Sequence, residues 1–557
     1  MYLTKKILPQ AQFTLRTIDR FELRKLLIQR KGNRSSGIDF IDGYAIKLAA
    51  PIIEDVLLHL VNLSITSSRF PTSWKMNKVS PHFKKGDRML GENWRPVTDI
   101  PFVSKLVEAT VYKQVNEYFS LNKLWHDNHH GFRAYHSTTT AINQMYDLWI
   151  NAAEKRQLSA ALLLDLTAAF DVVDHELLIK KLQQYNFSQS ALVWFQSYLN
   201  DRFQVVQVES RVSDPMQIGR QGVPQGSLLG PLLFLIFYND FPNIRLEGSS
   251  TLYADDDTDT IAHSNPLVLQ QKIQHEADLS TSWVKDNGMV VSGQKTKLMV
   301  IGTRELRNSK MIRNDLKMEI IVDGCRVVES ESEKLLGIII NNTMTWHNHL
   351  YGNIENKGLI DKLSHRAGMI NKLSKVMPKH RLKTIAEGIF FSILNYGIEV
   401  YGNVWGIVPH DDQSRRSTAF TKEDNRRLQI LVNKVLRCLT GLDREISTVE
   451  LHKKSNQLSV HQRSAFFSIL AVYKAIHFKQ PSYHYLRLVS ANDARKTRNK
   501  SATRIEYNLS ISRCSFFFRA SRLYDLLPLD LRRITSLTKF KRSVKKWTRQ
   551  HIPLLPS

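Results

Sequence analysis

Apolar and polar positions follow different periods along the chain, and each period predicts a type of element. Residues 21–30 repeat apolar side chains at helical spacing, and residues 51–66 read as an apolar helix. Between residues 71 and 107 the pattern predicts short strands and basic loops, whereas residues 157–300 alternate buried strands with amphipathic helices. The polar stretch 410–427 separates two helical patterns and predicts a linker or flexible loop.

The charge balance indicates a polyanionic partner. The chain has 557 residues, with 78 lysines and arginines against 52 aspartates and glutamates, a formal net charge of +26. Clustered cations bind phosphates by releasing condensed counterions, so this balance favours a nucleic acid over the alternative of a solvated basic surface. The tail, residues 491–557, carries 16 of the cations and 4 of the acids, a net charge of +12.

Aromatic residues interleave with the cations of this tail. They are Phe516, Phe517, Phe518, Tyr524, Phe540 and Trp547. Such a pattern predicts either rings that stack on bases while the cations follow the backbone, or an amphipathic helix that packs its rings onto the protein body. The sequence leaves both alternatives open.

Other features of the composition exclude whole classes of protein. Apolar residues make up 42% of the chain, which argues against a wholly disordered polypeptide. The isolated cysteines Cys325, Cys438 and Cys514 rule out a disulfide scaffold or a Cys-rich zinc module and fit a reducing compartment. No apolar run reaches the ~18 residues of a membrane helix, and the first residues lack the apolar core of a secretory signal. We therefore expect an intracellular protein with no membrane partner.

Two acidic sites lie at the ends of apolar segments. The run 160–164 predicts a strand buried on both faces that ends in Asp165, for which a helix N-cap or turn residue is the ordinary alternative. Asp255, Asp256 and Asp257 follow a short apolar lead and predict a hairpin with the acids at its tight turn. Consecutive carboxylates repel one another, and Mg²⁺ prefers such oxygen ligands. The alternative is a solvated acidic turn in a basic protein.

A tight, glycine-containing loop lies between the acidic sites. Gly222, Pro224 and Gly226 leave backbone N–H groups exposed, and Gln225 between them can lie against a nucleotide. Ser227 can cap the helix that follows. The alternative is a plain strand-to-helix turn, which would need neither two glycines nor the glutamine.

These three segments resemble a known family in their order and spacing. The strings AFDVVDH, QGVPQGS and YADD are similar to those of the reverse transcriptase of a non-LTR (LINE-type) retrotransposon, as in the Jockey and chicken-repeat-like elements of animals. Further similarity includes NWRPVTDIPFVSKLVE, HGFRAYHSTTTAI and KLLGIIINN. The resemblance implies an α+β right-hand polymerase with fingers, a palm with an antiparallel sheet, and a thumb. The expected division is an N-terminal basic helical extension (1–64), fingers and palm (65–341), a thumb-like helical region (342–480) and a helical basic C-terminal region (481–557).

The same resemblance implies an RNA-directed DNA polymerase. It would transfer a nucleotidyl group from a dNTP to the 3′-hydroxyl of a DNA primer on an RNA template, releasing pyrophosphate, with two Mg²⁺ ions and Mn²⁺ as the alternative metal. Asp165 and Asp255 match the metal ligands, with Asp256 assisting, and all three are the implied catalytic residues. Phe170 would lie under the sugar and exclude a 2′-hydroxyl. The other matched residues would contact the nucleotide or its phosphates, and they are Gln225, Arg95, Lys84, Lys85 and Lys295.

Several of these positions have alternative interpretations. Lys84 and Lys85 are equally expected at a solvated hairpin tip, and Lys297 is a rival to Lys295. Asp171 and Asp174 match the family, but a capping role before the next helix is the preferred interpretation. Asp257 stands where the family has threonine or serine, and the extra anion could bind a cation or weaken the approach of a dNTP.

Two other functions remain open from the sequence. One is a catalytically decayed remnant that still binds nucleic acid, and the other is a different palm polymerase such as a viral RNA replicase or an intron maturase. Elements of this family normally carry an upstream endonuclease, for which residues 1–50 leave no room, so a nick is expected to come from elsewhere. Action in the nucleus is implied by the family alone.

Overall fold

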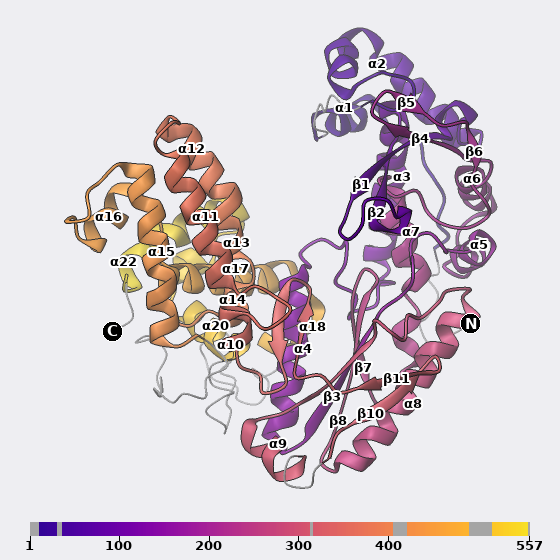
Figure 1. Cartoon of the computed structure of the whole chain (residues 1–557). Coiled ribbons are helices and arrows are strands. Elements are labelled where there is room, and N and C mark those ends of the chain that lie inside the picture. Colours follow the sequence, from indigo (N-terminus) through magenta and orange to yellow (C-terminus); the bar gives the residue numbers. More distant parts are fainter. Residues whose placement is uncertain (1–10, 30–35, 312–315, 405–419, 490–514, 555–557) are drawn as a thin grey trace. The chain divides into compact units, whose positions relative to one another are not determined.

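The computed structural model describes residues 11–29, 36–311, 316–404, 420–489 and 515–554 (Figure 1). The chain divides into two compact units, each assembled from separate stretches. The first unit comprises Met1–Phe132, Asp165–Arg245 and Asp278–Ser292, and the second comprises Arg133–Leu164, Leu246–Ala277 and Gly293–Ser557. The four-part division expected from the sequence follows other boundaries and stays a prediction.

The first unit contains a five-stranded mixed sheet. Strand β1 (Met76–Phe83) pairs antiparallel with β2 (Trp94–Asp99) and parallel with β4 (Phe203–Val208). The short strands β5 (Arg211–Val212) and β6 (Met216–Gln217) both pair with β4. The short strands and basic loops expected between residues 71 and 107 are therefore confirmed as far as residue 101, and the expectation is wrong for residues 102–107, which begin the helix Phe102–Leu121.

Helices supply most of the core of the first unit. In α7 every residue except Pro231 is buried, and α3 is buried along most of its length. The helices of this unit are α1 (Arg20–Gln29), α2 (Gly43–Thr66), α3 (Phe102–Leu121), α5 (His175–Gln184), α6 (Gln189–Leu199), α7 (Leu229–Tyr238) and the short turns η1 (Thr72–Trp74), η2 (Gly91–Asn93) and η3 (Phe241–Ile244). The helices expected over residues 21–30 and 51–66 are confirmed as α1 and the larger part of α2.

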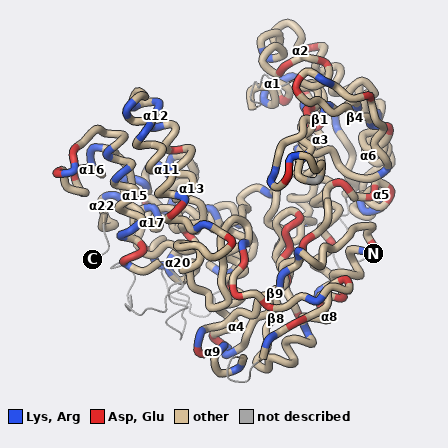
Figure 2. Tube along the Cα trace, in the orientation of Figure 1, with Lys and Arg blue, Asp and Glu red and all other residues tan. Residues whose placement is uncertain are grey.

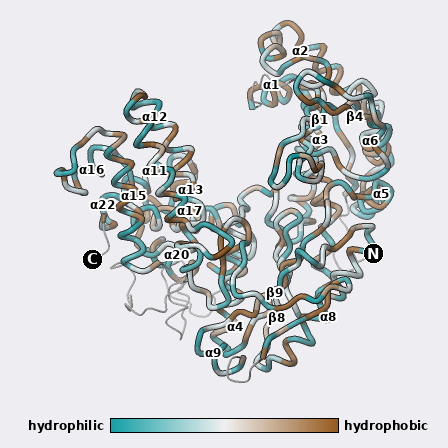
Figure 3. Tube along the Cα trace, in the orientation of Figure 1, coloured by the Kyte–Doolittle hydropathy of each residue, from teal (hydrophilic) through white to brown (hydrophobic). Residues whose placement is uncertain are grey.

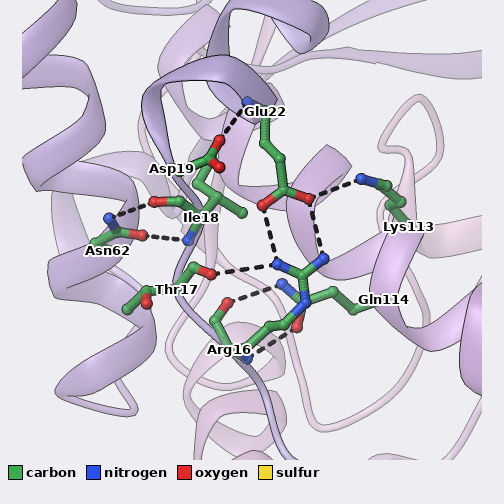
Figure 4. Close-up of polar contacts among 8 residues, drawn as sticks. All are labelled: Arg16, Thr17, Ile18, Asp19, Glu22, Asn62, Lys113 and Gln114. Carbon is green, nitrogen blue, oxygen red and sulfur yellow. Dashed lines mark hydrogen bonds and ion pairs between the residues drawn. The ribbon is translucent and has the colours of Figure 1, made fainter.

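Polar side chains fasten the N-terminal segment of the first unit to these helices (Figure 4). The side-chain amide of Gln114 on α3 donates to the backbone oxygen of Arg16 at 2.8 Å and accepts from its N–H at 2.9 Å. Asn62 on α2 pairs in the same way with both backbone groups of Ile18, at 2.9 Å. Two side-chain amides thus replace the partner strand that an extended segment would otherwise need.

One described helix is long and apolar enough to cross a membrane by length and composition. It is α2, whose most apolar window has a mean hydropathy of 1.6 and is 28% buried. Its Glu54 forms an ion pair with Arg24 of α1 at 2.6 Å, so this helix also packs within the first unit. A core helix of a water-soluble protein passes the same test, and α2 by itself carries no membrane assignment.

A four-stranded antiparallel sheet organises the second unit, in the order β7-β8-β3-β9. Its strands are β7 (Ser249–Tyr253), β8 (Asp256–His263), β3 (Leu158–Leu164) and β9 (Lys297–Ile301). All of β3 except Leu163 is buried, which confirms the strand predicted to be buried on both faces. Helix α4 (Thr138–Glu154) packs against β3, β7 and β8 and covers one face of the sheet.

Two hairpins and many helices complete the second unit. The hairpins are β10 (Glu319–Val322) with β11 (Cys325–Val328) and β12 (Ser332–Leu335) with β13 (Ile338–Asn341). The helices are α9 (Arg304–Lys310), α10 (His347–Tyr351), α11 (Leu359–Leu373), α12 (Lys379–Ala386), η5 (Glu387–Phe391), α13 (Ser392–Asn395), α14 (Ile398–Tyr401), α15 (Lys422–Thr440), α16 (Thr448–Ser455), α17 (Val460–Phe478), α18 (Ser482–Val489), α20 (Phe516–Asp525), α21 (Leu529–Arg532) and α22 (Leu537–His551). Helix α8 (Pro266–Asp286) has residues in both units. One apolar core joins the sheet to these helices, and their hydropathy can be followed in Figure 3.

The linker or flexible loop predicted over residues 410–427 is contradicted in its last part. Residues 405–419 lie outside the described part, so the prediction for residues 410–419 stays untested. Lys422 begins α15, and Thr421 caps this helix together with Asp424 in a capping box. The prediction of a loop is therefore wrong for residues 422–427.

The aromatic residues of the tail pack into the protein body, which decides between the two alternatives left open by the sequence. Phe516, Phe517 and Phe518 are buried in α20, while Phe540 and Trp547 are buried on α22. Phe540 stacks on Tyr473 of α17 at 3.6 Å rather than facing solvent. Base stacking by these rings is excluded, because burial in the apolar core leaves no ring face for a base. The charged residues of the tail helices can be followed in Figure 2.

Candidate active site

Strands β7 and β8 form a tight hairpin whose turn carries the acidic residues. Tyr253 pairs with Asp256, so Ala254 and Asp255 make a two-residue turn. Ala254 has a φ of 60°, the left-handed region that two-residue hairpin turns require. Asp255 is half-buried and Asp256 is exposed at the first position of β8. The predicted hairpin is confirmed, with two of the three acids at its tip.

Asp257 does not belong to the turn. It lies inside β8 opposite Leu252 and Leu164, and it is 2% exposed. Two residues farther along the same strand, Asp259 is also buried and accepts a hydrogen bond from the hydroxyl of Ser250 at 2.6 Å. The prediction that Asp257 lies at the tight turn is therefore wrong, and the alternative of a solvated acidic turn fails for Asp257 as well, because this residue belongs to β8 and its side chain is buried.

Strand β3 leads directly into Asp165. Its last residue, Leu164, pairs with Asp257 of the hairpin within the second unit, and Asp165 is the next residue along the chain. In the first unit, the backbone oxygen of Asp165 accepts from Ser292 N at 2.8 Å, and the next residues continue this pairing with Val290 and Val291. The backbone at Asp165 is thus held by residues 290–292 of the first unit, and its side chain is half-buried.

The metal ligands predicted from the sequence belong to different units, with Asp165 in the first and Asp255 and Asp256 in the second. Within the described residues, no group of three or more His, Cys, Asp or Glu side chains is arranged to hold a metal ion. The prediction that these three carboxylates share metal ions stays a prediction.

Phe170 sits in a turn of the first unit. The turn closes where Asp171 N donates to Ala168 O at 2.8 Å, and Val223 N of the glycine loop donates to Phe170 O at 2.9 Å. The ring of Phe170 stacks on Phe234 of α7 with centroids 4.3 Å apart and planes at 22°. The backbone and one ring face of Phe170 are therefore both held.

The glycine loop packs tightly against two neighbours. Gly226 has a φ of 109°, and a Cβ there would lie 2.5 Å from the carbonyl oxygen of Thr98. Gly222 has a φ of 85°, and a Cβ there would lie 2.8 Å from the carbonyl oxygen of Asp171. Thr98 N also donates to Gln225 O at 2.9 Å, which ties the loop to β2. Both glycines are needed for this close approach, which confirms the predicted tight loop, while its contact with a nucleotide stays a prediction.

Asp171 and Asp174 have different roles. Asp174 caps α5 by accepting from Leu177 N at 2.7 Å, which confirms the predicted cap. Asp171 instead accepts a hydrogen bond from Nε2 of Gln225 at 2.7 Å, so the prediction of a cap is wrong for Asp171. The place of Asp171 in the AFDVVDH string indicated that this residue matters. The string could not indicate its partner, because Gln225 lies 54 residues farther along the chain.

Glu108 is a further residue of this region that the sequence did not single out. It is fully buried on α3, and its Oε2 accepts from Leu228 N at 2.7 Å, just after the glycine loop. Tyr198 donates to the other carboxylate oxygen at 3.2 Å. Burial raises the pKa of Glu108, although these hydrogen bonds oppose the shift. Glu108 therefore anchors the start of α7, while Ser227 accepts from Gly230 N at 2.8 Å as the predicted cap.

His175 also contacts the glycine loop. It begins α5, and its Nε2 lies 2.8 Å from the carbonyl oxygen of Gly222, a distance at which the ring nitrogen donates. Burial lowers the pKa of His175 below its ordinary value. A neutral ring is enough for this hydrogen bond, because only one ring nitrogen has to carry a proton.

The predicted phosphate-binding residues lie on or near the β1–β2 hairpin. Arg95 on β2 is exposed and pairs in register with His82. Beside it, Trp94 donates from Nε1 to Arg88 O at 2.9 Å, which fits the prediction of a fixed position. Lys84 and Lys85 are exposed at the hairpin tip, where Lys84 N donates to Asn93 O at 2.8 Å. This geometry suits phosphate contact and a solvated tip equally.

Lys295 and its rival Lys297 lie in the second unit. Both are exposed; Lys295 precedes β9, and Lys297 is the first residue of that strand. Lys297 pairs in register with Leu163 of β3, two residues before Asp165. The register places Lys297 at the strand end but does not decide between the two lysines.

Comparison with known proteins identifies a family that includes the strands and loops described above. Residues 83–340 match the family described as reverse transcriptase (RNA-dependent DNA polymerase). This stretch forms a reverse transcriptase domain. The domain includes the predicted residues on β2, in the glycine loop and in the acidic hairpin, and its β3 and β8 are central strands of an antiparallel palm sheet. A right-hand polymerase of the α+β class is thus the fold, as the sequence predicted.

Relatives of this chain include proteins of insect transposons. The chain is 25% identical over 439 residues to the "Probable RNA-directed DNA polymerase from transposon BS" of Drosophila melanogaster, covering 77% of this chain and 45% of that protein. It is 24% identical over 438 residues to the corresponding protein from transposon X-element of the same species, covering 78% and 45%. It is 24% identical over 403 residues to the "RNA-directed DNA polymerase from mobile element jockey", covering 71% and 42%.

The chain therefore spans less than half the length of these relatives. Among solved structures, an apo telomerase from Candida tropicalis aligns with a TM-score of 0.32 and 13% identity over 49% of this chain and 54% of that chain. The recognition of a non-LTR reverse transcriptase from three short strings is confirmed by the family match and by the transposon relatives.

Proposed function

We propose that this chain is an RNA-directed DNA polymerase that adds dNTPs to the 3′-hydroxyl of a DNA primer paired with an RNA template. The observation that carries the proposal is the β7–β8 hairpin, which presents Asp255 and Asp256 within a reverse transcriptase domain next to the strand that runs into Asp165. In each step the primer oxygen would form a bond to the α-phosphorus of the dNTP, and the bond from that phosphorus to pyrophosphate would break.

A divalent metal is the cofactor that this family implies, and we propose Mg²⁺, with Mn²⁺ as a substitute. The carboxylates of Asp165, Asp255 and Asp256 are the hard oxygen donors that Mg²⁺ prefers, and none of the three is fully buried. Asp165 and Asp255 would be the ligands, with Asp256 assisting. Two bound ions would activate the primer oxygen and stabilise the leaving pyrophosphate.

The chain's own residues would bind and orient the nucleotide. Gln225, held by Asp171, would contact the incoming dNTP, and the ring of Phe170 would exclude a 2′-hydroxyl. Arg95 would bind the triphosphate through its planar guanidinium, with Lys84 or Lys85 as a point charge. Nζ of Lys295 would donate a proton to an oxygen of the departing pyrophosphate.

Primer extension on an RNA template, with Mg²⁺ and purified protein, tests this proposal. We expect extension by the wild type and none by Asp255→Asn, with binding of the template–primer duplex kept. Asp323→Asn is the matched control, because Asp323 lies in the turn of the β10–β11 hairpin of the same unit. Folded wild-type protein that binds the duplex without extending it would contradict the proposal and support the alternative of a decayed, nucleic-acid-binding remnant.

The partners and site of action belong to the same proposal. The RNA template, DNA primer and dNTPs follow from the activity, and action in the nucleus rests on the family resemblance. An endonuclease activity would have to nick the target DNA for such a polymerase to prime on it.

A further inference from the structure

Phe132 adopts an unusual backbone conformation for a bulky residue. Its φ is 51°, in the left-handed region that non-glycine residues rarely enter. Its side chain is nevertheless 48% exposed, so burial in a core does not account for the conformation. A strained, exposed aromatic residue in an enzyme domain is a reason to look for a functional contact.

The contact that Phe132 makes is with Phe170. The two rings stand at 89° with centroids 6.4 Å apart, an edge-to-face pair within the first unit. Phe170 also stacks on Phe234, which is 0% exposed on α7. The ring of Phe170 is therefore supported from two directions, by a buried ring and by a partly exposed one.

We propose that Phe132 is a positioning residue for sugar selection, acting by holding the ring of Phe170 in place. This inference rests on the proposed function, in which Phe170 excludes the 2′-hydroxyl of a ribonucleotide. Because hydrogen bonds from Val223 N and Asp171 N fix the backbone of the Phe170 turn, the ring can move only by rotating its side chain. Phe132 and Phe234 are the rings that resist this rotation.

The consequence differs between the two classes of nucleotide. A deoxynucleotide fits with the ring of Phe170 where it stands, so its incorporation gains nothing when the ring is freed. A ribonucleotide needs the ring to move, and loss of the contact with Phe132 makes that movement easier. Selectivity depends on the difference between the activation free energies for incorporating the two nucleotides. Only the activation free energy for the ribonucleotide includes the cost of breaking the contact between Phe132 and Phe170.

The test measures kcat/KM for a dNTP and for the matching rNTP with the wild type, Phe132→Ala, Phe170→Ala and the double variant. We expect Phe132→Ala to lower the preference for dNTP by about fivefold, the value of one aromatic pair of about 1 kcal/mol. Phe170→Ala lowers the preference further, and adding Phe132→Ala to it has no additional effect. Such non-additivity is expected only if Phe132 acts through Phe170.

Two further variants separate this role from a general effect on the loop. Tyr135→Ala is the matched control, because Tyr135 also has a positive φ, 64°, and is 44% exposed, but its ring stacks on Phe478. It should keep the wild-type sugar preference. Phe132→Gly removes both the ring and the backbone strain, and it should relax selectivity as Phe132→Ala does.

The outcomes distinguish this inference from the function on which it rests. Wild-type protein that does not extend a primer contradicts the proposed function and this inference with it. An active wild type with unchanged sugar preference in Phe132→Ala overturns this inference alone. Additive effects in the double variant, or wild-type selectivity in Phe132→Gly, overturn it as well.

Discussion

Nε2 of Gln225 donates a hydrogen bond to Oδ1 of Asp171, with 2.7 Å between the two atoms. The contact joins the glycine loop to the turn that follows Asp165, and both segments belong to the first unit. The backbone of Gln225 is held separately by Thr98 N on β2. The side chain proposed to meet the incoming nucleotide is thus oriented by a carboxylate.

Replacing Asp171 by alanine should raise the KM for dNTP while leaving kcat close to that of the wild type. The lost hydrogen bond involves a charged acceptor at an exposed position, so we expect a change of about 1 kcal/mol, or about fivefold. Asp171→Asn is the control, because its amide oxygen can still accept from Gln225. Single-nucleotide incorporation kinetics measure the effect, and an unchanged KM in Asp171→Ala would show that Gln225 needs no such partner.

The buried ion pair between Lys181 and Asp240 should be important for stability. Nζ of Lys181 lies 2.7 Å from Asp240, with the two side chains 1% and 2% exposed, and it also donates to Phe237 O at 2.6 Å. Asp240→Ala leaves a buried ammonium without its counter-ion, which should cost about 3–5 kcal/mol. Urea denaturation followed by tryptophan fluorescence measures the loss.

The control for this prediction is a pair on the surface. Glu450 and Lys454 lie 3.0 Å apart on α16, each 50% exposed, and Glu450→Ala should cost less than about 1 kcal/mol. Equal losses of stability in the two variants would contradict the importance of the buried pair.

Burial lowers the pKa of Lys181, whereas the charge of Asp240 opposes this shift.

Glu22 makes the stability of the first unit depend on pH in the acid range. Hydrogen bonds from Arg16 and then from Lys113 lower the pKa of Glu22 from 4.5 to about 2 (Figure 4). A carboxyl with a lowered pKa in the folded state stabilises the protein fully above its unfolded value, and this contribution disappears as the pH falls toward the folded value. The stabilisation should therefore decrease between about pH 4.5 and about pH 2.

Glu22→Gln isolates this contribution. At neutral pH the variant should be less stable by roughly 1 kcal/mol, a value reduced for solvent screening of a partly exposed pair. Near pH 2 the two proteins should unfold alike. Denaturant titrations at several pH values provide the measurement, and a stability difference that persists unchanged at pH 2 would exclude this role of the carboxylate.

The local elements of the site could be predicted from the sequence because their signals are local. The apolar run before Asp165 and the short lead before Asp255 are continuous in the chain, and the glycines of the loop indicate where backbones come close. The position of Asp257 was harder to predict, since a run of three acids does not show where the turn ends and the strand begins. The register Tyr253–Asp256 decides it.

Partners distant in the chain could not be predicted. Glu108 binds the backbone of Leu228 across 120 residues, and its place at the end of the string NWRPVTDIPFVSKLVE indicates the family but not the partner. The tail shows the same limit, because interleaved aromatic and basic residues are equally typical of a nucleic-acid surface and of a packed amphipathic helix. Burial of Phe540 and Trp547 against their neighbours distinguishes the two.

The most direct test of the central claim is to count the Mn²⁺ ions that the protein binds together with a template–primer duplex and a non-hydrolysable dNTP. Electron paramagnetic resonance of titrated Mn²⁺ gives this number without relying on activity. We predict about two ions for the wild type and a loss of binding in both Asp165→Asn and Asp255→Asn, because the carboxylates would share the metals. Wild-type Mn²⁺ binding in either variant would contradict the claim that Asp165 and Asp255 hold the metals together.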